Sequence, residues 1–210
     1  MITPILSWGR DRAWKEKMVS YLPAFHSGTF FDLACGTGDI TFALAGKYPQ
    51  GTVIGVDLTL EMLNVARDAC TYSNVNLVIQ DMGVIGIKDE SVDIVTGGYA
   101  LRNAPDLDQA LSEIYRVLKR GGKALFLDFS KSPHSGRQQL SYLVLKAWGS
   151  LWGLIFHRSP DVYGYIAESL QTYPDRKALS DKVISHGFND LHSKIFFLGL
   201  IEILHLRKAN

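Results

Sequence analysis

Apolar and polar positions alternate in regular blocks along the chain. Short apolar runs typical of buried strands are separated by segments whose apolar residues recur with a helical period. The predicted strands cover residues 30–34, 52–56, 75–79, 92–97 and 123–129, and the predicted helices cover 38–47, 59–71 and 106–119. The third helix is expected to stop at Arg120-Gly121-Gly122. This alternation predicts an α/β fold with a parallel sheet covered by helices on both faces.

The C-terminal part breaks the alternation. Residues 188–193 and 195–206 look like two consecutive strands with no helix between them, which predicts an antiparallel hairpin on the sheet edge. With the five earlier strands, this makes a mostly parallel seven-stranded sheet. A chain of 210 residues that is 47% hydrophobic can bury one substantial core and is short for two domains. We therefore expect one domain over residues 1–210.

The segment 30–41 combines a strand, a glycine loop and a helix. An apolar run ends in Asp32, the turn Gly36-Thr37-Gly38 follows, and a helical pattern comes next. Missing side chains let a ligand lie against the backbone and the helix N-terminus. Asp57 closes the second strand about twenty residues on, where a nucleotide ribose needs a carboxylate.

The loop departs from the dinucleotide-binding pattern Gly-x-Gly-x-x-Gly. Ala34 occupies the first glycine position and Thr41 the third, although a pyrophosphate needs close backbone approach there. Asp32 would repel an anion and suits a cationic ligand. These residues favour S-adenosyl-L-methionine over NAD. The alternative is a glycine turn that only connects a strand to a helix.

Charge and cysteine content narrow the function further. A net charge of +1 gives no reason to expect nucleic acid as a partner. Cys35 and Cys70 are too few for a disulfide framework and lack metal-ligand spacing, so we expect a reducing compartment and no metal. Cys35 is interpreted as a small buried thiol. The N-terminal residues lack a signal-peptide pattern, and we expect a cytoplasmic protein.

Several segments resemble one family. The chain is similar to the class I S-adenosylmethionine-dependent methyltransferases, which have a Rossmann-like fold, and specifically to the C-methyltransferases of ubiquinone and menaquinone biosynthesis. The segments that carry the resemblance are Arg12-Ala-Trp-Lys15, Asp32-Leu-Ala-Cys-Gly-Thr-Gly-Asp39, Tyr99-Ala-Leu-Arg-Asn103, Tyr115-Arg-Val-Leu-Lys119, Gly121-Gly122, Asp128-Phe-Ser-Lys131, Tyr163-Gly-Tyr-Ile-Ala-Glu-Ser169, Tyr173-Pro-Asp175 and His186-Gly-Phe188. The similarity runs nearly end to end.

The resemblance implies a set of cofactor-binding residues. S-adenosyl-L-methionine, whose product is S-adenosyl-L-homocysteine, would lie on the glycine loop and on four positions beyond it. Asp57 would bind the ribose hydroxyls, Asp81 the adenine amine and Met82 the adenine ring, while Gly98 would lie near the methionine portion. The complete expected set is Asp32, Gly36, Thr37, Gly38, Thr41, Asp57, Asp81, Met82 and Gly98. For Asp81 the alternative is a turn-forming aspartate after a strand.

The implied reaction is methyl transfer to a ring carbon of a reduced, prenylated quinone. Arg102 stays charged at any working pH, so it could stabilise a phenolate or orient a water that relays a proton, but it is a poor base. Asn103 and Tyr99 would fix the ring oxygens. The alternative for Arg102 is a structural salt bridge to Asp106 or Glu168.

Residues 137–157 are unusually apolar for a charged, water-exposed domain. The run is too short and too interrupted to span a bilayer. One interpretation is a lid or amphipathic helix, within a helical insertion at 137–175, that admits a prenyl tail at the membrane surface. The other is a packing or homodimer helix. Family members usually carry a further N-terminal segment that covers the cofactor, so we expect either that another element closes the site here or that activity is reduced.

Two further functions stay open beside the quinone-ring C-methyltransferase. One is a methyltransferase of the same fold that acts on another small phenolic, polyketide or terpenoid acceptor. The other is a non-catalytic scaffold that binds S-adenosylmethionine. The glycine loop together with Asp57 and Arg102 argues against the scaffold.

Overall fold

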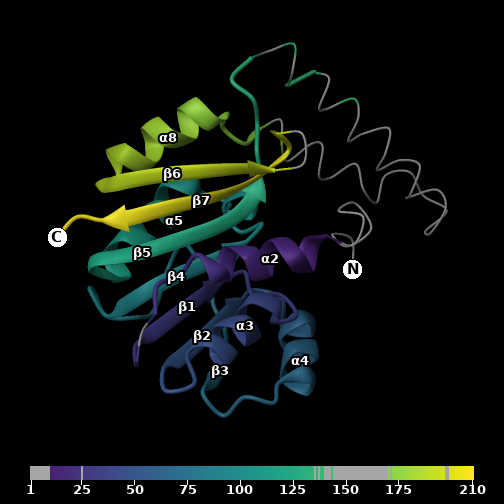
Figure 1. The fold of residues 1–210 in the computed structure, drawn as a ribbon, viewed down its shortest axis with the longest axis vertical. Coiled ribbons are helices and arrows are strands. Elements are labelled where there is room, and N and C mark those ends of the chain that lie inside the picture. The colour runs from purple at the N-terminus through teal and green to yellow at the C-terminus, as the bar shows by residue number, and fades with distance from the viewer. Residues whose placement is uncertain are drawn as a thin grey trace.

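The protein is built around one seven-stranded sheet (Figure 1). The computed structural model describes residues 10–24, 26–134, 172–196 and 199–210, with single positions at 136, 138, 139, 143 and 170. The strands are β1 (Thr29–Leu33), β2 (Thr52–Asp57), β3 (Val75–Ile79), β4 (Val92–Gly98), β5 (Leu118–Phe129), β6 (Phe188–Phe196) and β7 (Ile201–Lys208), in the order β3-β2-β1-β4-β5-β7-β6. Strands β1 to β5 pair in parallel, and β7 is antiparallel to both β5 and β6. The predicted fold class, including the C-terminal hairpin, is confirmed.

Helices connect these strands. They are α2 (Asp11–Ser20), α3 (Asp39–Lys47), α4 (Leu60–Ala69), the 3₁₀ turn η1 (Leu101–Asn103), α5 (Leu107–Val117) and α8 (Arg176–Ser185). Two of them begin at an aspartate that accepts hydrogen bonds from the first turn: Asp106 from the backbone N–H of Gln109, and Asp175 from those of Lys177 and Ala178. Such caps satisfy donors that have no partner within the helix.

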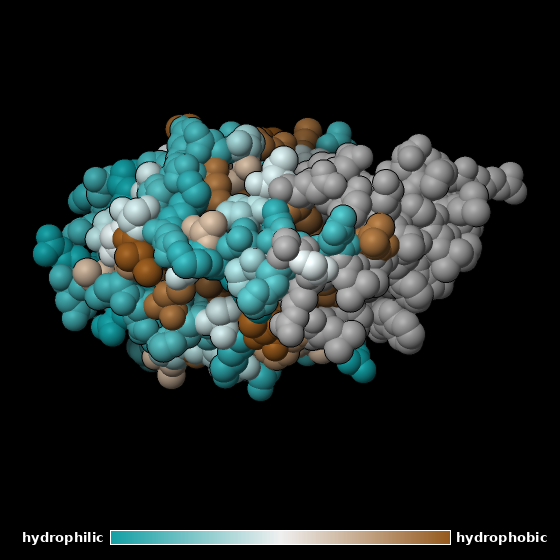
Figure 2. Space-filling model, turned by 90° about the horizontal axis from the view of Figure 1, so that it is seen from above, coloured by the Kyte–Doolittle hydropathy of each residue, from teal (hydrophilic) through white to brown (hydrophobic). Residues whose placement is uncertain are grey.

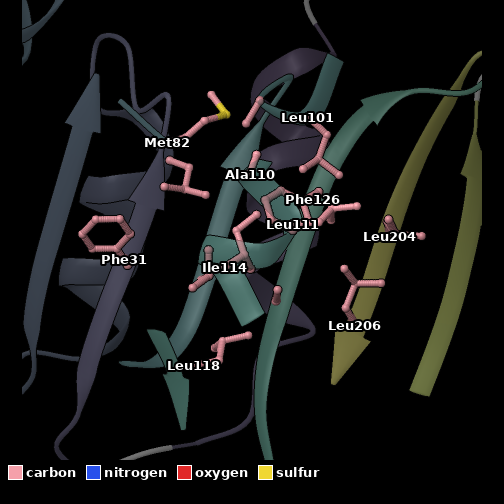
Figure 3. Packing of buried hydrophobic residues seen from close by; sticks show 14 of the residues in the cluster. Phe31, Met82, Leu101, Ala110, Leu111, Ile114, Leu118, Phe126, Leu204 and Leu206 are labelled. Carbon is pink, nitrogen blue, oxygen red and sulfur yellow. The ribbon is translucent and has the colours of Figure 1, made fainter. Parts of the chain in front are cut away.

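The sheet carries a hydrophobic core on each face because successive strand residues point to opposite sides. Phe30 packs with residues of α2 and α3, whereas its neighbour Phe31 packs with residues of α5 and α8. Leu125 and Phe126 of β5 divide between the two cores in the same way. Figure 3 shows the second of these clusters, with Met82 and Leu101 at the end toward the carboxyl ends of the strands. The helices on both faces therefore hold one rigid sheet.

Predicted boundaries were wrong at two junctions, between α5 and β5 and between β6 and β7. Helix α5 ends at Val117 rather than at the glycines, because Leu118 is already extended and pairs with Val92 as the first residue of β5. Strand β5 therefore begins at residue 118 instead of 123 and contains Gly121, whose φ is +70°. Strand β7 begins at Ile201 rather than at 195, because Ile195 and Phe196 still belong to β6 and pair with Glu202 and Ile201. Long-range pairing, which local patterns do not contain, sets both boundaries.

The carboxyl ends of the five parallel strands meet at one edge of the sheet, and α2 begins near this edge and packs on α3 and β5 (Figure 1). The order of strands reverses between β1 and β4, which is where open α/β sheets bind ligands. We call this edge the carboxyl rim; it comprises residues 32–39, 57, 80–82, 97–103 and 128–131.

Several sequence predictions lie outside the described residues. These are most of the apolar run 137–157, most of the 137–175 insertion, and Glu168. Among the helices that are described, none is long and apolar enough to cross a bilayer. Seen from above, the described surface is mostly hydrophilic, with hydrophobic side chains in small separate areas (Figure 2). The domain assignment, the lid and the membrane contact stay predictions.

Candidate active site

The glycine loop between β1 and α3 has the backbone that its sequence requires. Gly36 and Gly38 have φ values of +56° and +89°, and Ala34 also lies in the left-handed region at +49°. A Cβ atom at Gly38 would come within 2.5 Å of the Phe42 ring, whereas one at Gly36 would meet no atom within 4 Å. Gly38 is thus needed for the turn itself. Gly36, followed by the half-buried Thr37, leaves backbone open to a ligand.

Asp57 ties the end of β2 to this loop. One carboxylate oxygen accepts a hydrogen bond from the backbone N–H of Gly36 at 2.8 Å, and the other accepts one from the N–H of Thr59 at 2.9 Å. The half-buried carboxylate is therefore fixed in orientation. Each oxygen keeps a further lone pair for a hydroxyl donor. This arrangement could bind the two hydroxyls of a ribose.

Asp81 and Met82 follow β3 on the same rim. Asp81 accepts a hydrogen bond from the N–H of Gly83 at 2.8 Å, which is the turn-forming contact considered as its alternative role. Only one of its oxygens is used in that contact. The Met82 side chain packs in the cluster with Phe31 and Leu101, and 8% of the residue is exposed (Figure 3). The adenine contacts of both residues stay predictions.

Asp32 lies beneath the loop. It is fully buried and accepts hydrogen bonds from the hydroxyls of Thr41 at 2.7 Å and Thr96 at 2.8 Å. Burial raises the pKa of Asp32 to about 6, against the opposing effect of these two bonds and of the nearby charge of Lys15. Asp32 on β1 therefore links Thr41 on α3 to Thr96 on β4 beneath the glycine loop. Their direct contact with a cofactor stays a prediction.

The residues after β4 form a strained turn. Tyr99 has a φ of +58°, an uncommon value for a bulky residue. Its hydroxyl donates to Asp11 of α2 at 2.8 Å, and its carbonyl accepts from the Asn103 side chain at 2.9 Å. Gly98 precedes this turn, and a Cβ there would come within 2.8 Å of Ile40. Tyr99 and Asn103 thus fix each other on the rim, and their contacts with an acceptor ring stay predictions.

Arg102 is held in place by Asp128 at the end of β5. Its Nε atom lies 3.6 Å from the Asp128 carboxylate, its backbone N–H donates to the same carboxylate at 3.0 Å, and its guanidinium lies over the Phe129 ring at 5.1 Å. The Arg102 side chain is only 6% exposed. A salt bridge therefore exists, and Asp128 is its partner among the described residues. Asp106 instead caps α5, and Glu168 lies outside the described residues.

A second carboxylate stands beside this pair. Glu202 of β7 is the direct cross-strand partner of Asp128, and both residues are buried. Burial raises the pKa of Asp128 to about 6, an effect increased by Glu202 and opposed by Arg102, and burial also raises the pKa of Glu202. Burial raises the pKa of the Tyr173 hydroxyl, the negative charges of Asp128 and Glu202 raise it further, and the charge of Arg102 opposes them. The resemblance included Asp128 and Tyr173, but no sequence pattern indicated that Glu202 would join them.

Two other groups near the rim were considered for chemistry. Cys35 is buried, so its interpretation as a small buried thiol is confirmed, and burial together with the negative charges of Asp32 and Asp57 raises the pKa of that thiol. Within the described ranges, no cluster of His, Cys, Asp or Glu side chains could hold a metal ion. The acidic groups of the rim are instead bound by hydroxyls, backbone N–H groups and Arg102.

Comparisons with known proteins agree with this geometry. Residues 1–207 match the ubiE/COQ5 methyltransferase family. The chain is 32% identical over 206 residues to a demethylmenaquinone methyltransferase of Geobacillus sp. (strain WCH70), which covers 96% of this chain and 88% of that protein. It is 31% identical over 210 residues to the protein of the same name from Bacillus cereus, covering 98% and 88%.

Solved structures share the fold at low sequence identity. A chain of the Haloferax volcanii complex between the Trm112 methyltransferase activator and a methyltransferase gives a TM-score of 0.72 at 17% identity, covering 97% of this chain and 93% of that one. Haemonchus contortus phosphoethanolamine N-methyltransferase 2 with S-adenosyl-L-methionine gives 0.70 at 16%, covering 97% and 53%. The expected methyl donor, S-adenosyl-L-methionine, is confirmed by the family. The chain belongs to the ubiE/COQ5 methyltransferase family.

Proposed function

We propose that the protein transfers the methyl group of S-adenosyl-L-methionine to a ring carbon of a reduced, prenylated quinone. The observation that carries this proposal is the guanidinium of Arg102, fixed by Asp128 and Phe129 at the rim beside the glycine loop. A fixed, poorly solvated cation suits the negative charge of an ionised hydroquinone. The names of the relatives from Geobacillus and Bacillus cereus point to the same class of acceptor.

The residues of the β1–β3 ends fit the donor. The open backbone at Gly36 and the oriented carboxylate of Asp57 match a nucleoside with two ribose hydroxyls. Asp81 retains one oxygen for an amine donor. When bound, the donor supplies an electrophilic methyl group on a sulfonium. The chain has to hold it in line with the acceptor carbon and exclude water.

The residues of the β4 and β5 ends fit the acceptor. In the proposed reaction an ionised ring hydroxyl makes the ring carbon nucleophilic. The ring carbon takes the methyl group as the S–CH₃ bond breaks and S-adenosyl-L-homocysteine leaves, and it then loses its proton to a water molecule. Arg102 would stabilise the phenolate oxygen, since its charge persists at every working pH. Tyr99 and Asn103, which brace each other, would limit how the ring can lie. Peripheral contact with a membrane surface and a homodimer remain part of this proposal.

An assay of methyl transfer tests the proposal. The protein is incubated with methyl-labelled S-adenosyl-L-methionine and a demethylated quinol, and the product is examined by mass spectrometry for a ring-bound methyl group. A simple phenol and a quinol without a prenyl tail serve as parallel acceptors. We expect a C-methylated product with the prenylated quinol. Transfer only to the phenol would favour another acceptor class, and binding of the donor without transfer to any acceptor would favour the scaffold.

A further inference from the structure

Lys15 of α2 lies over the point where the order of strands reverses. Its Nζ atom is 2.8 Å from Asp39, the first residue of α3 after the glycine loop. On the other side, a Cβ atom at Gly98 would lie 3.8 Å from Cε of Lys15. The side chain therefore bridges the ends of β1 and β4, which are neighbours in the sheet. No sequence pattern assigned Lys15 a role at this site.

Helix α2 is anchored so that Lys15 has little freedom. Asp11 accepts from the Tyr99 hydroxyl at 2.8 Å and pairs with Lys15 at 2.7 Å. At the other end of the helix, Lys47 of α3 donates to the carbonyls of Val19 and Leu22 at 2.8 and 2.9 Å. The Lys15 side chain is 15% exposed, an unusual degree of burial for a lysine. The structure thus holds an ammonium group at a defined place on the rim.

The surroundings of Lys15 favour its charged form. Burial alone would lower the pKa of Lys15, but its hydrogen bonds to Asp11 and Asp39 outweigh that effect, and the pKa is raised. An ammonium group has three N–H donors, and the two carboxylates account for two of them. The Asp39 side chain is 55% exposed, so water can solvate it if a ligand displaces it. An incoming anion can therefore bind Lys15 without leaving a buried charge behind.

The arrangement of the rim identifies that anion. Asp57 and Asp81 lie at the ends of β2 and β3, where the adenosine portion of the donor is proposed to bind. The methionine portion would then extend toward β1 and β4, where Lys15 lies. We propose that Lys15 binds the carboxylate of the methionine portion of S-adenosyl-L-methionine. The proposal rests on the proposed placement of the donor along the rim. It also gives α2 a role in covering the donor.

Calorimetric binding with three ligands tests this assignment. S-adenosyl-L-methionine carries the carboxylate, its decarboxylated analogue lacks only that group, and 5′-methylthioadenosine lacks the whole amino-acid portion. For Lys15→Met, we expect affinity for the intact donor to fall about tenfold to a hundredfold, because a charge-assisted hydrogen bond is lost. Affinities for the other two ligands should stay within about threefold of the wild type, and Lys15→Arg should restore part of the loss.

The control variant is Lys17→Met, on the same helix. Lys17 is exposed, and its ammonium lies over the Tyr21 ring at 5.2 Å. We expect this variant to bind all three ligands like the wild type. Equal losses for all three ligands in Lys15→Met would mean that Lys15 only holds α2 in place, and would overturn the proposal. Unchanged affinity for the intact donor would overturn it as well.

These outcomes are separate from those of the proposed reaction. If the wild type binds the donor but methylates no quinol, the acceptor assignment fails while the comparison of ligands still decides the role of Lys15. If the wild type binds neither the donor nor 5′-methylthioadenosine, the placement of the donor fails and this proposal fails with it. Thermal melting of Lys15→Met shows whether it is folded, and Lys15→Gln provides a second neutral variant.

Discussion

The acidic residues in the two halves of the carboxyl rim differ in their burial and in their hydrogen-bond partners. At the ends of β2 and β3, Asp57 and Asp81 are half-buried and accept backbone N–H groups, Asp57 from Gly36 of the neighbouring loop and from Thr59, and Asp81 from Gly83. At the ends of β5 and β7, Asp128 and Glu202 are buried opposite each other, with Arg102 beside them. The first half has oriented carboxylates with spare lone pairs for a ligand. In the second half, Asp128 pairs with a cation and Glu202 accepts a hydrogen bond from the Ser193 hydroxyl.

This difference indicates a division of labour. Carboxylates that are fixed but accessible suit a polar ligand that must bind and leave. Burying a cation together with a carboxylate costs desolvation free energy. If one partner is removed, the other is left as an uncompensated buried charge. Such an arrangement is useful where charge develops during a reaction. We therefore expect variants of the first half to change donor affinity and variants of the second half to change turnover.

Arg102→Lys should have the largest effect. Lysine keeps the charge but loses the planar guanidinium that pairs with Asp128 and lies over the Phe129 ring. We expect kcat to fall about a hundredfold to a thousandfold, with donor affinity nearly unchanged. Steady-state kinetics with a demethylated quinol and calorimetry with the donor measure the two quantities. Arg12→Lys, at a side chain that is 88% exposed, is the matched control. A wild-type rate combined with a lower melting temperature would mean that Arg102 is structural.

Asp57→Ala should weaken donor binding by about one to two orders of magnitude. The change removes the carboxylate proposed to bind the ribose hydroxyls and also releases the N–H groups of Gly36 and Thr59. Calorimetry with S-adenosyl-L-homocysteine measures the loss. Asp68→Ala, at an exposed position on α4, should bind the same ligand as tightly as the wild type. Equal affinity of Asp57→Ala and the wild type would remove Asp57 from the site.

Asp32→Asn should change the pH dependence of stability by a smaller amount. The folded-state pKa of Asp32 is about 6, above its ordinary value of 3.8. Its ionised form is therefore disfavoured in the folded protein, and its effect on stability becomes more favourable as the pH falls from about 6 toward 4. The variant lacks this titration. We expect its free energy of unfolding, relative to the wild type, to decrease between pH 7.5 and pH 4.5. Urea unfolding at several pH values measures it, and a pH-independent difference would contradict the assignment.

Tyr173→Phe should have the smallest effect on stability. Among the described residues, none forms a hydrogen bond with the buried Tyr173 hydroxyl. Removing a buried hydroxyl without a partner should leave the free energy of unfolding unchanged or raise it by up to about 1 kcal/mol. Urea unfolding at pH 7 measures this change. A loss of several kcal/mol would show that the hydroxyl stabilises the Asp128 and Glu202 pair.

The two halves of the carboxyl rim also differ in how well the sequence predicts them. The glycine loop and Asp57 could be predicted because their function depends on local conformation and on spacing along a strand–loop–helix unit. Strand β3 was predicted at its observed bounds, 75–79, since a short apolar run between polar turns is a local signal. Helix α8 went unpredicted, although Asp175 and the spacing of Leu179 and Val183 were available as signals.

The β4–β7 half depends on pairing between distant segments. Arg102 meets Asp128 only because β4 and β5 are neighbours, and Asp128 meets Glu202 only because β7 pairs with β5 in one register. The sequence suggested Asp106 or Glu168 as the partner, but the Asp106 side chain caps α5, and Glu168 lies outside the described residues. For the same reason, the pairing of Leu118 with Val92 shortened the predicted helix. Tertiary contacts overrode local preference at each of these positions.

Single-turnover methyl transfer to a demethylated, prenylated quinol at saturating donor tests the division of labour most directly. The rate is compared among the wild type, Asp57→Ala and Arg102→Lys. We predict that Asp57→Ala recovers a rate close to the wild type once the donor is saturating, whereas Arg102→Lys stays slow at every donor concentration. A slow Asp57→Ala at saturation, together with an Arg102→Lys rescued by added donor, would contradict the account.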